Sequence, residues 1–285
     1  MKKLSLATIF IIISMNLFSQ NKELIYLWPG KVPGELEEKN IPVIAPSKND
    51  NVLRIAEITD PAFEIWLADP HKGNGAGVII CPGGGYNILA WDKEGTEIAG
   101  WLNSLGYSAF VLQYRVPDKK EGALQDVQRA IRIVRNNAKT WNLDPDKIGV
   151  MGFSAGGSLS ARAGTLFGKK SYSYIDKTDS ISCRPSFAML IYPAYLDQGE
   201  RRSLTPELTI SKETPPFFIF QTADDPHGNS ALVMAAAMRD AKRPAELHLL
   251  PAGGHGYGLR SGIKAAETWP LLAGKWLTVT LSENR

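Results

Sequence analysis

Residues 148–157 read Ile-Gly-Val-Met-Gly-Phe-Ser-Ala-Gly-Gly, and this stretch decides how the rest of the chain is interpreted. It contains a Gly-x-Ser-x-Gly motif centred on Ser154, which follows an apolar run and precedes a helical pattern of small residues. A serine at a strand-to-helix elbow has a strained backbone that lifts its hydroxyl above the sheet. Gly152 and Gly156 are needed because a side chain at either position would collide with the neighbouring strand or helix. The motif predicts that Ser154 is a nucleophile.

Apolar, strand-like runs alternate with helical patterns from residue 53 onward. The central runs are apolar on both faces, which is typical of a mostly parallel sheet with helices on both faces. Runs 53–58 and 63–67 flank the turn signal Thr59-Asp60-Pro61 and predict an N-terminal antiparallel hairpin. The pattern as a whole predicts a single α/β domain with right-handed crossovers. The other expected strands are 77–81, 109–114, 148–151, 187–192, 217–220 and 247–250, and the expected helices are 92–105, 122–141, 155–164, 229–241 and 263–277.

The first residues have the pattern of a secretory leader. Lys2 and Lys3 precede a mostly apolar run over 4–18, and polar residues follow it. The run is short for a bilayer span and is interrupted by polar side chains, so a cleaved signal peptide over 1–19 is favoured over an uncleaved anchor. The sequence therefore predicts a domain over 20–285 that is secreted or periplasmic, with no stable membrane insertion after cleavage.

Charge and cysteine content exclude several classes of protein. The formal net charge is +3, from 32 basic and 29 acidic residues, and the leader holds two of the basic ones. A nearly neutral domain has no electrostatic footprint for nucleic acid. Cys81 and Cys183 each adjoin an apolar run, so two buried free thiols are expected, with one disulfide as the alternative in an exported protein. No Cys/His cluster has metal-ligand spacing, so no metal site is expected.

A base for the serine is expected downstream, because in chains with this elbow the acid follows the serine and the histidine follows the acid. His255 follows the last expected strand in a Gly-Gly-His-Gly-Tyr-Gly loop, whose glycines let the imidazole bend over the serine. His71 precedes the elbow, His248 lies inside a strand, and His227 lies in the loop of the acid. The order of the motifs thus predicts His255 as the base.

The orienting acid is expected where the strand that ends near Gln221 gives way to Thr222-Ala223-Asp224-Asp225-Pro226. Both aspartates fit a turn at the end of a strand. Asp225, in an Asp-Pro turn, is favoured over Asp224, which remains the alternative. The carboxylate would hold the imidazole in the correct tautomer and stabilise its positive charge.

An oxyanion hole completes the expected site. One donor is the backbone N–H of Ala155, the residue after the nucleophile. The second is expected from the loop Pro82-Gly83-Gly84-Gly85-Tyr86, which follows the 77–81 strand. Its glycines permit the backbone to turn N–H groups inward, and Gly84 and Gly85 are the candidate donors.

With these motifs assembled, most of the chain beyond the leader resembles secreted α/β-hydrolases of the acetylxylan esterase group and related carbohydrate esterases. The matching residues are Leu27-Trp28-Pro29-Gly30, Pro82-Gly83-Gly84-Gly85-Tyr86, Lys93-Glu94-Gly95, Trp101-Leu102-Asn103, Tyr114-Arg115, 124–131, 149–157, 215–217 through Asp224-Asp225, and 246–248 through 253–256. The resemblance implies an α/β-hydrolase fold and a serine carboxylesterase that removes O-acetyl or similar small acyl groups from hemicellulose such as xylan. Ester hydrolysis by a serine nucleophile needs no metal or organic cofactor, so none is expected.

The expected partner is therefore an acylated carbohydrate, and four aromatic residues are candidates for stacking on a sugar ring. Aromatic side chains chiefly contribute buried apolar area, so packing is the competing interpretation for each. A feruloyl esterase or a serine peptidase of the same fold would use the same triad, and a non-catalytic binding protein is a further alternative. The oligomeric state is left open. The candidate stacking residues are Tyr86, Trp91, Tyr195 and Tyr257.

Overall fold

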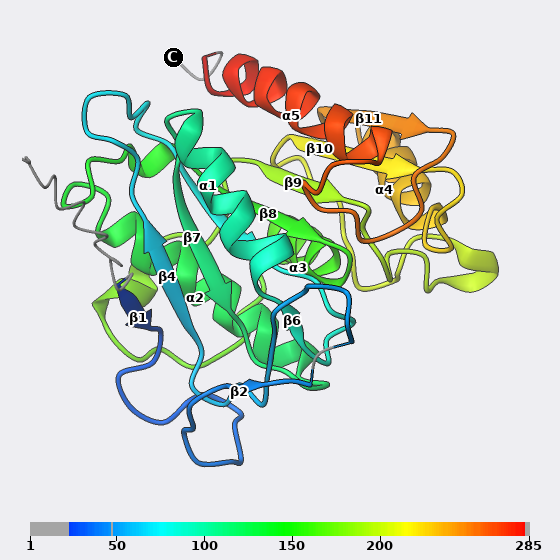
Figure 1. Cartoon of the computed structure of the whole chain (residues 1–285). Helices are drawn as coiled ribbons and strands as arrows, with labels where there is room; N and C mark the ends of the chain where they lie inside the picture. The colour runs from blue at the N-terminus through cyan, green and yellow to red at the C-terminus, as the bar shows by residue number, and fades with distance from the viewer. Residues whose placement is uncertain (1–22, 47, 283–285) are drawn as a thin grey trace, which may run out of the picture.

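A central sheet of eight strands organises the computed structural model, which describes residues 23–46 and 48–282 (Figure 1). Its strand order is β1-β4-β7-β5-β8-β9-β10-β11, and all neighbours from β7 to β11 are parallel. The sheet is thus mostly parallel, as the apolar runs predict. The strands are β1 (Leu24–Tyr26), β4 (Ala62–Trp66), β5 (Gly77–Cys81), β7 (Ser108–Gln113), β8 (Ile148–Phe153), β9 (Ala188–Ile191), β10 (Phe217–Thr222) and β11 (Ala245–Leu250).

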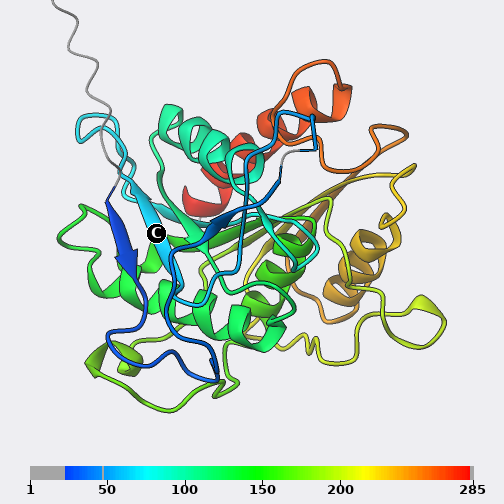
Figure 2. The same cartoon turned by 60° about the horizontal axis from the view of Figure 1, so that its bottom comes forward.

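Helices cover both faces of this sheet. Figure 2 shows α1 and α5 on one face and α2, α3 and α4 on the other, which confirms the expected layers. The chain runs from β5 to β7 and then returns past β5 to β8, so right-handed crossovers place α1 and α2 on opposite faces. The helices are α1 (Glu97–Ser104), α2 (Lys120–Asn136), α3 (Ala155–Thr165), α4 (Asn229–Asp240) and α5 (Lys264–Ser282).

The antiparallel part of the fold lies at its N-terminal side, but its strand pairs differ from the expected hairpin. β4 pairs with β1 and β7 in the central sheet. The preceding run contributes β3 (Arg54–Ala56) to a separate small sheet, between β2 (Val43–Ile44) and β6 (Leu89–Ala90). The turn between the two runs is bonded to an earlier segment of the chain: the Thr59 hydroxyl donates to the Glu38 carbonyl and accepts from the Asn40 N–H. Contacts with the preceding loop therefore replace pairing across the turn.

A buried ionic cluster fixes α2 against β7 and the N-terminal segment. Asp126 accepts hydrogen bonds from the backbone N–H and the guanidinium of Arg115 and, at 3.0 Å, from the indole N–H of Trp28. All three side chains are buried. Burial raises the pKa of the Asp126 carboxyl, and the Arg115 charge opposes that rise. Such a cluster is costly to break, because the remaining partner would stay buried as an unpaired charge.

Both cysteines are buried free thiols, as the sequence predicts. Burial raises the pKa of the Cys81 thiol to about 12, so this side chain is inert at neutral pH. Across the part of the chain that the structure describes, no helix has the length and apolar character needed to cross a membrane. The expected signal peptide, 1–19, lies outside the described residues.

Candidate active site

Four loops meet at one edge of the sheet, because the carboxyl ends of parallel strands all point the same way. They follow β5, β8, β10 and β11. The order in which strands are added to the sheet reverses at β5, because β7 lies on one side of it and the next strand, β8, on the other. In open α/β sheets such a switch point leaves a crevice outside the strand ends, where ligands bind. The topology alone therefore gathers the glycine loop, the serine, the acidic pair and the histidine at one place.

Ser154 occupies a sharp elbow between β8 and α3. Its φ of 53° and ψ of −118° lie outside the helical and extended regions, and a non-glycine residue there is strained. The two motif glycines are fixed by close approach: a Cβ on Gly152 would lie 1.9 Å from the Gly156 carbonyl oxygen, and a Cβ on Gly156 would lie 1.9 Å from that of Cys81. Neither contact can be relieved without moving the backbone, so the elbow requires glycine at both positions.

His255 bridges Ser154 and Asp225. Its Nε2 lies 2.8 Å from the serine Oγ, and its Nδ1 lies 2.6 Å from Asp225 Oδ2. The Asp225 side chain is fully buried, and its second oxygen accepts the backbone N–H of His227. A carboxylate beside Nδ1 places the ring proton there, which leaves Nε2 free to accept the serine proton. This geometry allows His255 to act as a general base toward Ser154.

Asp224 has a different position from its neighbour. It is exposed, and its two oxygens accept the backbone N–H groups of Gly253 and Gly254, in the turn just before His255. These hydrogen bonds, Gly254 first, lower the pKa of the Asp224 carboxyl. The two aspartates therefore hold the same loop in two ways: Asp225 through the imidazole, and Asp224 through the main chain.

The glycine loop after β5 presents unused backbone donors beside the serine. Gly84 and Gly85 have φ values of +136° and +69°, which favour glycine strongly. Among residues 23–46 and 48–282 the N–H groups of Gly84, Gly85 and Ala155 donate to no protein acceptor. The loop is fixed by the Tyr114 hydroxyl, which donates to the Pro82 carbonyl at 2.6 Å. Such donors can stabilise the oxyanion of an acyl-transfer reaction.

The four aromatic candidates for sugar stacking are not equivalent. Tyr86, Trp91 and Tyr257 are buried, so none of them exposes a ring face to a ligand, and their contacts are those of core side chains. Tyr195 is partly exposed and has a φ of +61°. Its ring lies 5.5 Å from that of His227, which in turn lies 5.0 Å from the His255 ring. Only Tyr195 of the four can border a substrate at this site.

Three further residues at the site carry no clear signal in the sequence. His227 reaches the site because it lies two residues beyond Asp225 in the same turn. The Tyr192 ring lies 5.1 Å from the His255 ring, and its hydroxyl donates to the buried Glu94 carboxylate at 2.9 Å. Glu94 falls in one of the matching motifs, but no spacing rule connects it to the serine. In the described residues no group of His, Cys, Asp and Glu side chains is arranged to hold a metal ion.

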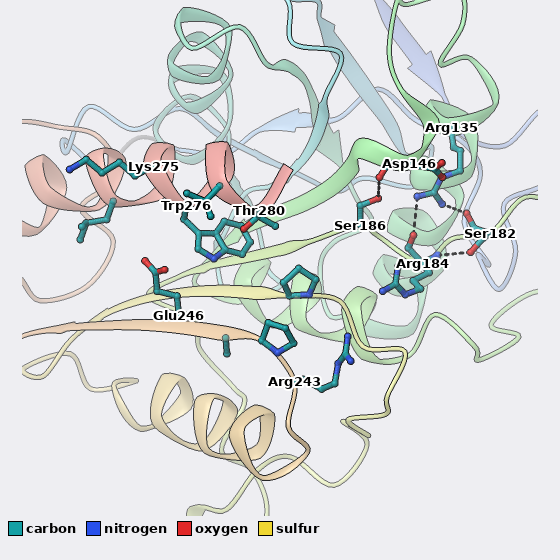
Figure 3. A pocket seen from close by; sticks show the side chains of 15 residues that line it. Arg135, Asp146, Ser182, Arg184, Ser186, Arg243, Glu246, Lys275, Trp276 and Thr280 are labelled. Atoms are coloured by element: carbon teal, nitrogen blue, oxygen red, sulfur yellow. Dashed lines mark hydrogen bonds between the residues drawn. The ribbon is translucent and has the colours of Figure 1, made fainter. Parts of the chain in front are cut away.

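A cavity of about 960 Å³ lies at the opposite, amino-terminal edge of the strands, between α5 and the starts of β9, β10 and β11 (Figure 3). Three arginines line it, Arg135, Arg184 and Arg243, and each donates its Nε–H to a backbone carbonyl. These side chains hold the loops that enter the sheet. No residue of the Ser154–His255–Asp225 group lines this cavity, so it is separate from the candidate active site.

The fold, the elbow and the order of the loops define the class: this protein is an α/β hydrolase. A family model described as BD-FAE matches residues 63–186. The solved acetyl ester-xyloside bifunctional hydrolase from Caldicellulosiruptor lactoaceticus is 33% identical, and the match covers 90% of this chain and 96% of that one, with a TM-score of 0.73. The chain therefore belongs to the α/β-hydrolase esterase family.

Two curated relatives are longer proteins. An acetylxylan esterase from Xylanibacter ruminicola is 32% identical over 73% of this chain and 46% of its own length. Endo-1,4-beta-xylanase B from Butyrivibrio fibrisolvens is 34% identical over 63% of this chain and 32% of its own length. The chain thus spans less than half the length of either relative.

Proposed function

We propose that this protein is a serine carboxylesterase whose catalytic triad is Ser154, His255 and Asp225. The observation that carries the proposal is the continuous hydrogen-bond chain from the serine Oγ through both ring nitrogens to a fully buried carboxylate. A buried carboxylate bonded to Nδ1 orients the imidazole toward the serine and stabilises the positive charge that forms on it. Here this series of hydrogen bonds ends at a strained serine, beside backbone N–H groups that donate to no acceptor among the described residues, which is the arrangement that acyl transfer needs.

The reaction proceeds through an acyl-enzyme. The Ser154 Oγ attacks the ester carbonyl while His255 Nε2 takes the serine proton, and the oxyanion accepts hydrogen bonds from Ala155 and from Gly84 or Gly85. His255 then donates this proton to the leaving alcohol as the bond from the acyl carbon to the alkoxy oxygen breaks. A water molecule attacks the acyl-serine and gives a proton to His255. His255 returns this proton to the Ser154 Oγ as the bond from the acyl carbon to Oγ breaks, which releases the carboxylic acid and restores the free serine.

The proposed substrate is a small acyl ester, chiefly acetate, on a hemicellulose such as xylan. Support comes from the names of the relatives: one is an acetylxylan esterase, and one solved neighbour is an acetyl ester-xyloside hydrolase. Tyr195, the partly exposed aromatic at the site, is the proposed face for a sugar ring. A secreted or periplasmic location, through a signal peptide over 1–19, would place the enzyme with its polymer.

The test compares Ser154→Ala with Ser158→Ala, one turn further along α3. The first variant should lose hydrolysis of 4-nitrophenyl acetate and covalent labelling by paraoxon, and the control should keep both. Acetate release from acetylated xylan then tests the substrate, with ferulate release and peptide cleavage measured in parallel. Full turnover by Ser154→Ala would refute the triad. Good activity on the aryl ester without release of acetate from xylan would refute acetylated xylan as the substrate.

A further inference from the structure

Glu94 is a buried carboxyl to which no cationic side chain of the described residues is bonded. It is only 4% exposed and lies in a single π-helical turn, Asp92–Thr96, directly before α1. Its Oε2 accepts the backbone N–H of Gly83 at 2.8 Å, and its Oε1 accepts the Tyr192 hydroxyl at 2.9 Å. A buried carboxylate is costly unless its hydrogen bonds are satisfied. Glu94 has the hydrogen bonds but no bonded counter-charge among the described residues, and burying a charge without a counter-charge is costly. It also lies in a π turn, of the kind often found at functional sites.

One of these hydrogen bonds reaches the proposed oxyanion loop. Gly83 is the first glycine of that loop, and its N–H donates to Glu94, whereas the next two N–H groups have no acceptor within the part of the chain that the structure describes. The contact is close: a Cβ on Gly83 would lie 2.6 Å from Glu94 Oε2 and 2.9 Å from the Ser154 Cβ. The carboxylate thus fixes the peptide that precedes both candidate donors, directly behind the serine.

The other hydrogen bond reaches the loop that carries His255. The Tyr192 hydroxyl, which donates to Glu94, also accepts the backbone N–H of Gly258 at 3.0 Å. The same ring packs edge-on against His255 and, at 4.4 Å, against Tyr257. A continuous path of hydrogen bonds therefore runs from Gly258 through Tyr192 and Glu94 to Gly83. It joins two loops that are far apart in the sequence.

We propose that Glu94 is a positioning residue, which through Gly83 and Tyr192 holds the oxyanion loop and the histidine loop in register with Ser154. This inference rests on the proposed esterase function. Its physical basis is that the donors must lie about 3 Å from the place where the oxyanion forms, and a displacement of about 1 Å can cost about 100-fold in rate. One carboxylate bonded to both loops restricts such a displacement of either loop relative to Ser154.

Electrostatics adds to this geometry. Burial raises the pKa of Glu94, and the hydrogen bonds from Tyr192 and Gly83 and the charges of His255 and Lys93 oppose the rise. The pKa of the neighbouring Tyr114 phenol is raised well above the usual value, chiefly by burial and to a smaller degree by nearby groups that include Glu94.

The experiment compares Glu94→Gln with Glu97→Gln, a control on α1 whose carboxylate is outside the site and pairs with Arg260. The amide has the size of the carboxyl but only one acceptor oxygen, so either the Gly83 N–H or the Tyr192 O–H loses its acceptor. We expect kcat on 4-nitrophenyl acetate to fall about 10- to 100-fold, with less than a threefold change in KM. The control should keep the wild-type kcat. Each rate is divided by the concentration of active sites. That concentration is measured from the nitrophenolate released when paraoxon reacts with the serine, so only folded, reactive enzyme is counted.

Tyr192→Phe supplies a second arm, because it keeps the ring against His255 and removes only the hydroxyl that joins Glu94 to Gly258. If the path acts as a unit, the double variant should lose little more than Glu94→Gln alone. A wild-type kcat per titrated site in Glu94→Gln, or losses that multiply in the double variant, would overturn the positioning role. If instead the wild-type enzyme neither hydrolyses the ester nor reacts with paraoxon, the esterase function itself fails.

Discussion

Exchange of each aspartate of the acidic pair for asparagine separates two roles that the structure assigns to adjacent residues. Asp225 is the hydrogen-bond partner of His255 Nδ1, at 2.6 Å and out of solvent. In Asp225→Asn, the amide NH₂ turned toward Nδ1 would move the ring proton to Nε2, where it can no longer take the proton of Ser154. An exchange of this kind in a serine triad costs about 10⁴-fold in kcat. That factor corresponds to about 5 kcal/mol of activation free energy.

Asp224→Asn is the matched control, since it makes the same chemical change one residue away. The Asp224 carboxylate faces solvent and holds the N–H groups of Gly253 and Gly254. Its amide oxygen can keep one of these bonds, so kcat should fall less than about tenfold. Steady-state hydrolysis of 4-nitrophenyl acetate at pH 7 and 8 measures both variants, and circular dichroism checks that each is folded.

The reasoning fails if the two variants exchange roles, that is, if Asp224→Asn loses three or more decades of kcat while Asp225→Asn retains most activity. Equal, modest losses in both would also refute it, because His255 would then need no single buried partner. A loss in Asp225→Asn accompanied by unfolding is resolved by Asp225→Glu. That variant keeps the charge and should recover part of the rate.

Three further predictions concern stability. Asp126→Asn leaves the Arg115 guanidinium buried without its counter-charge and should cost about 3–5 kcal/mol by urea unfolding, with kcat per folded molecule unchanged. Gly149→Ala places a Cβ 2.3 Å from a phenylalanine ring and should cost about 1–3 kcal/mol, whereas Gly100→Ala, with open space on α1, should be neutral or stabilising by up to about 1 kcal/mol. A hydrogen-bonded arginine lowers the pKa of Asp176 to about 2, below its usual 3.8. Its ionised form therefore contributes stability above about pH 4 that is lost as the pH falls through 2, so Asp176→Asn should shift the urea midpoint more at pH 6 than at pH 3.

Much of the fold follows from local patterns in the sequence. The runs that form β5 and β7 to β10 are apolar on both faces, and each becomes a buried strand of the central sheet. Helix boundaries shift by a few residues: the pattern over 122–141 becomes Lys120–Asn136, and that over 92–105 starts with a π turn. End effects of this size are expected, because helix ends are set by local hydrogen bonds that periodicity does not encode.

The expected hairpin shows where local patterns are insufficient. Two strand-like runs around a turn signal are compatible with pairing to each other, yet each finds its partners elsewhere. The same limit applies to Tyr86, Trp91 and Tyr257. Aromatic residues near a glycine loop suit a core as well as a ligand face, and only packing decides between the two.

The sequence by itself determined the α/β class, the elbow around Ser154 and the glycine loop before it, because these depend on periodicity and on backbone sterics within a few residues. It also gave the order in which the acidic pair and His255 follow. Only the tertiary structure decided which aspartate meets the histidine, and it alone joined Glu94 to Gly83 and Tyr192. These contacts link loops from different strands, and their geometry is fixed by how the carboxyl ends of a parallel sheet converge.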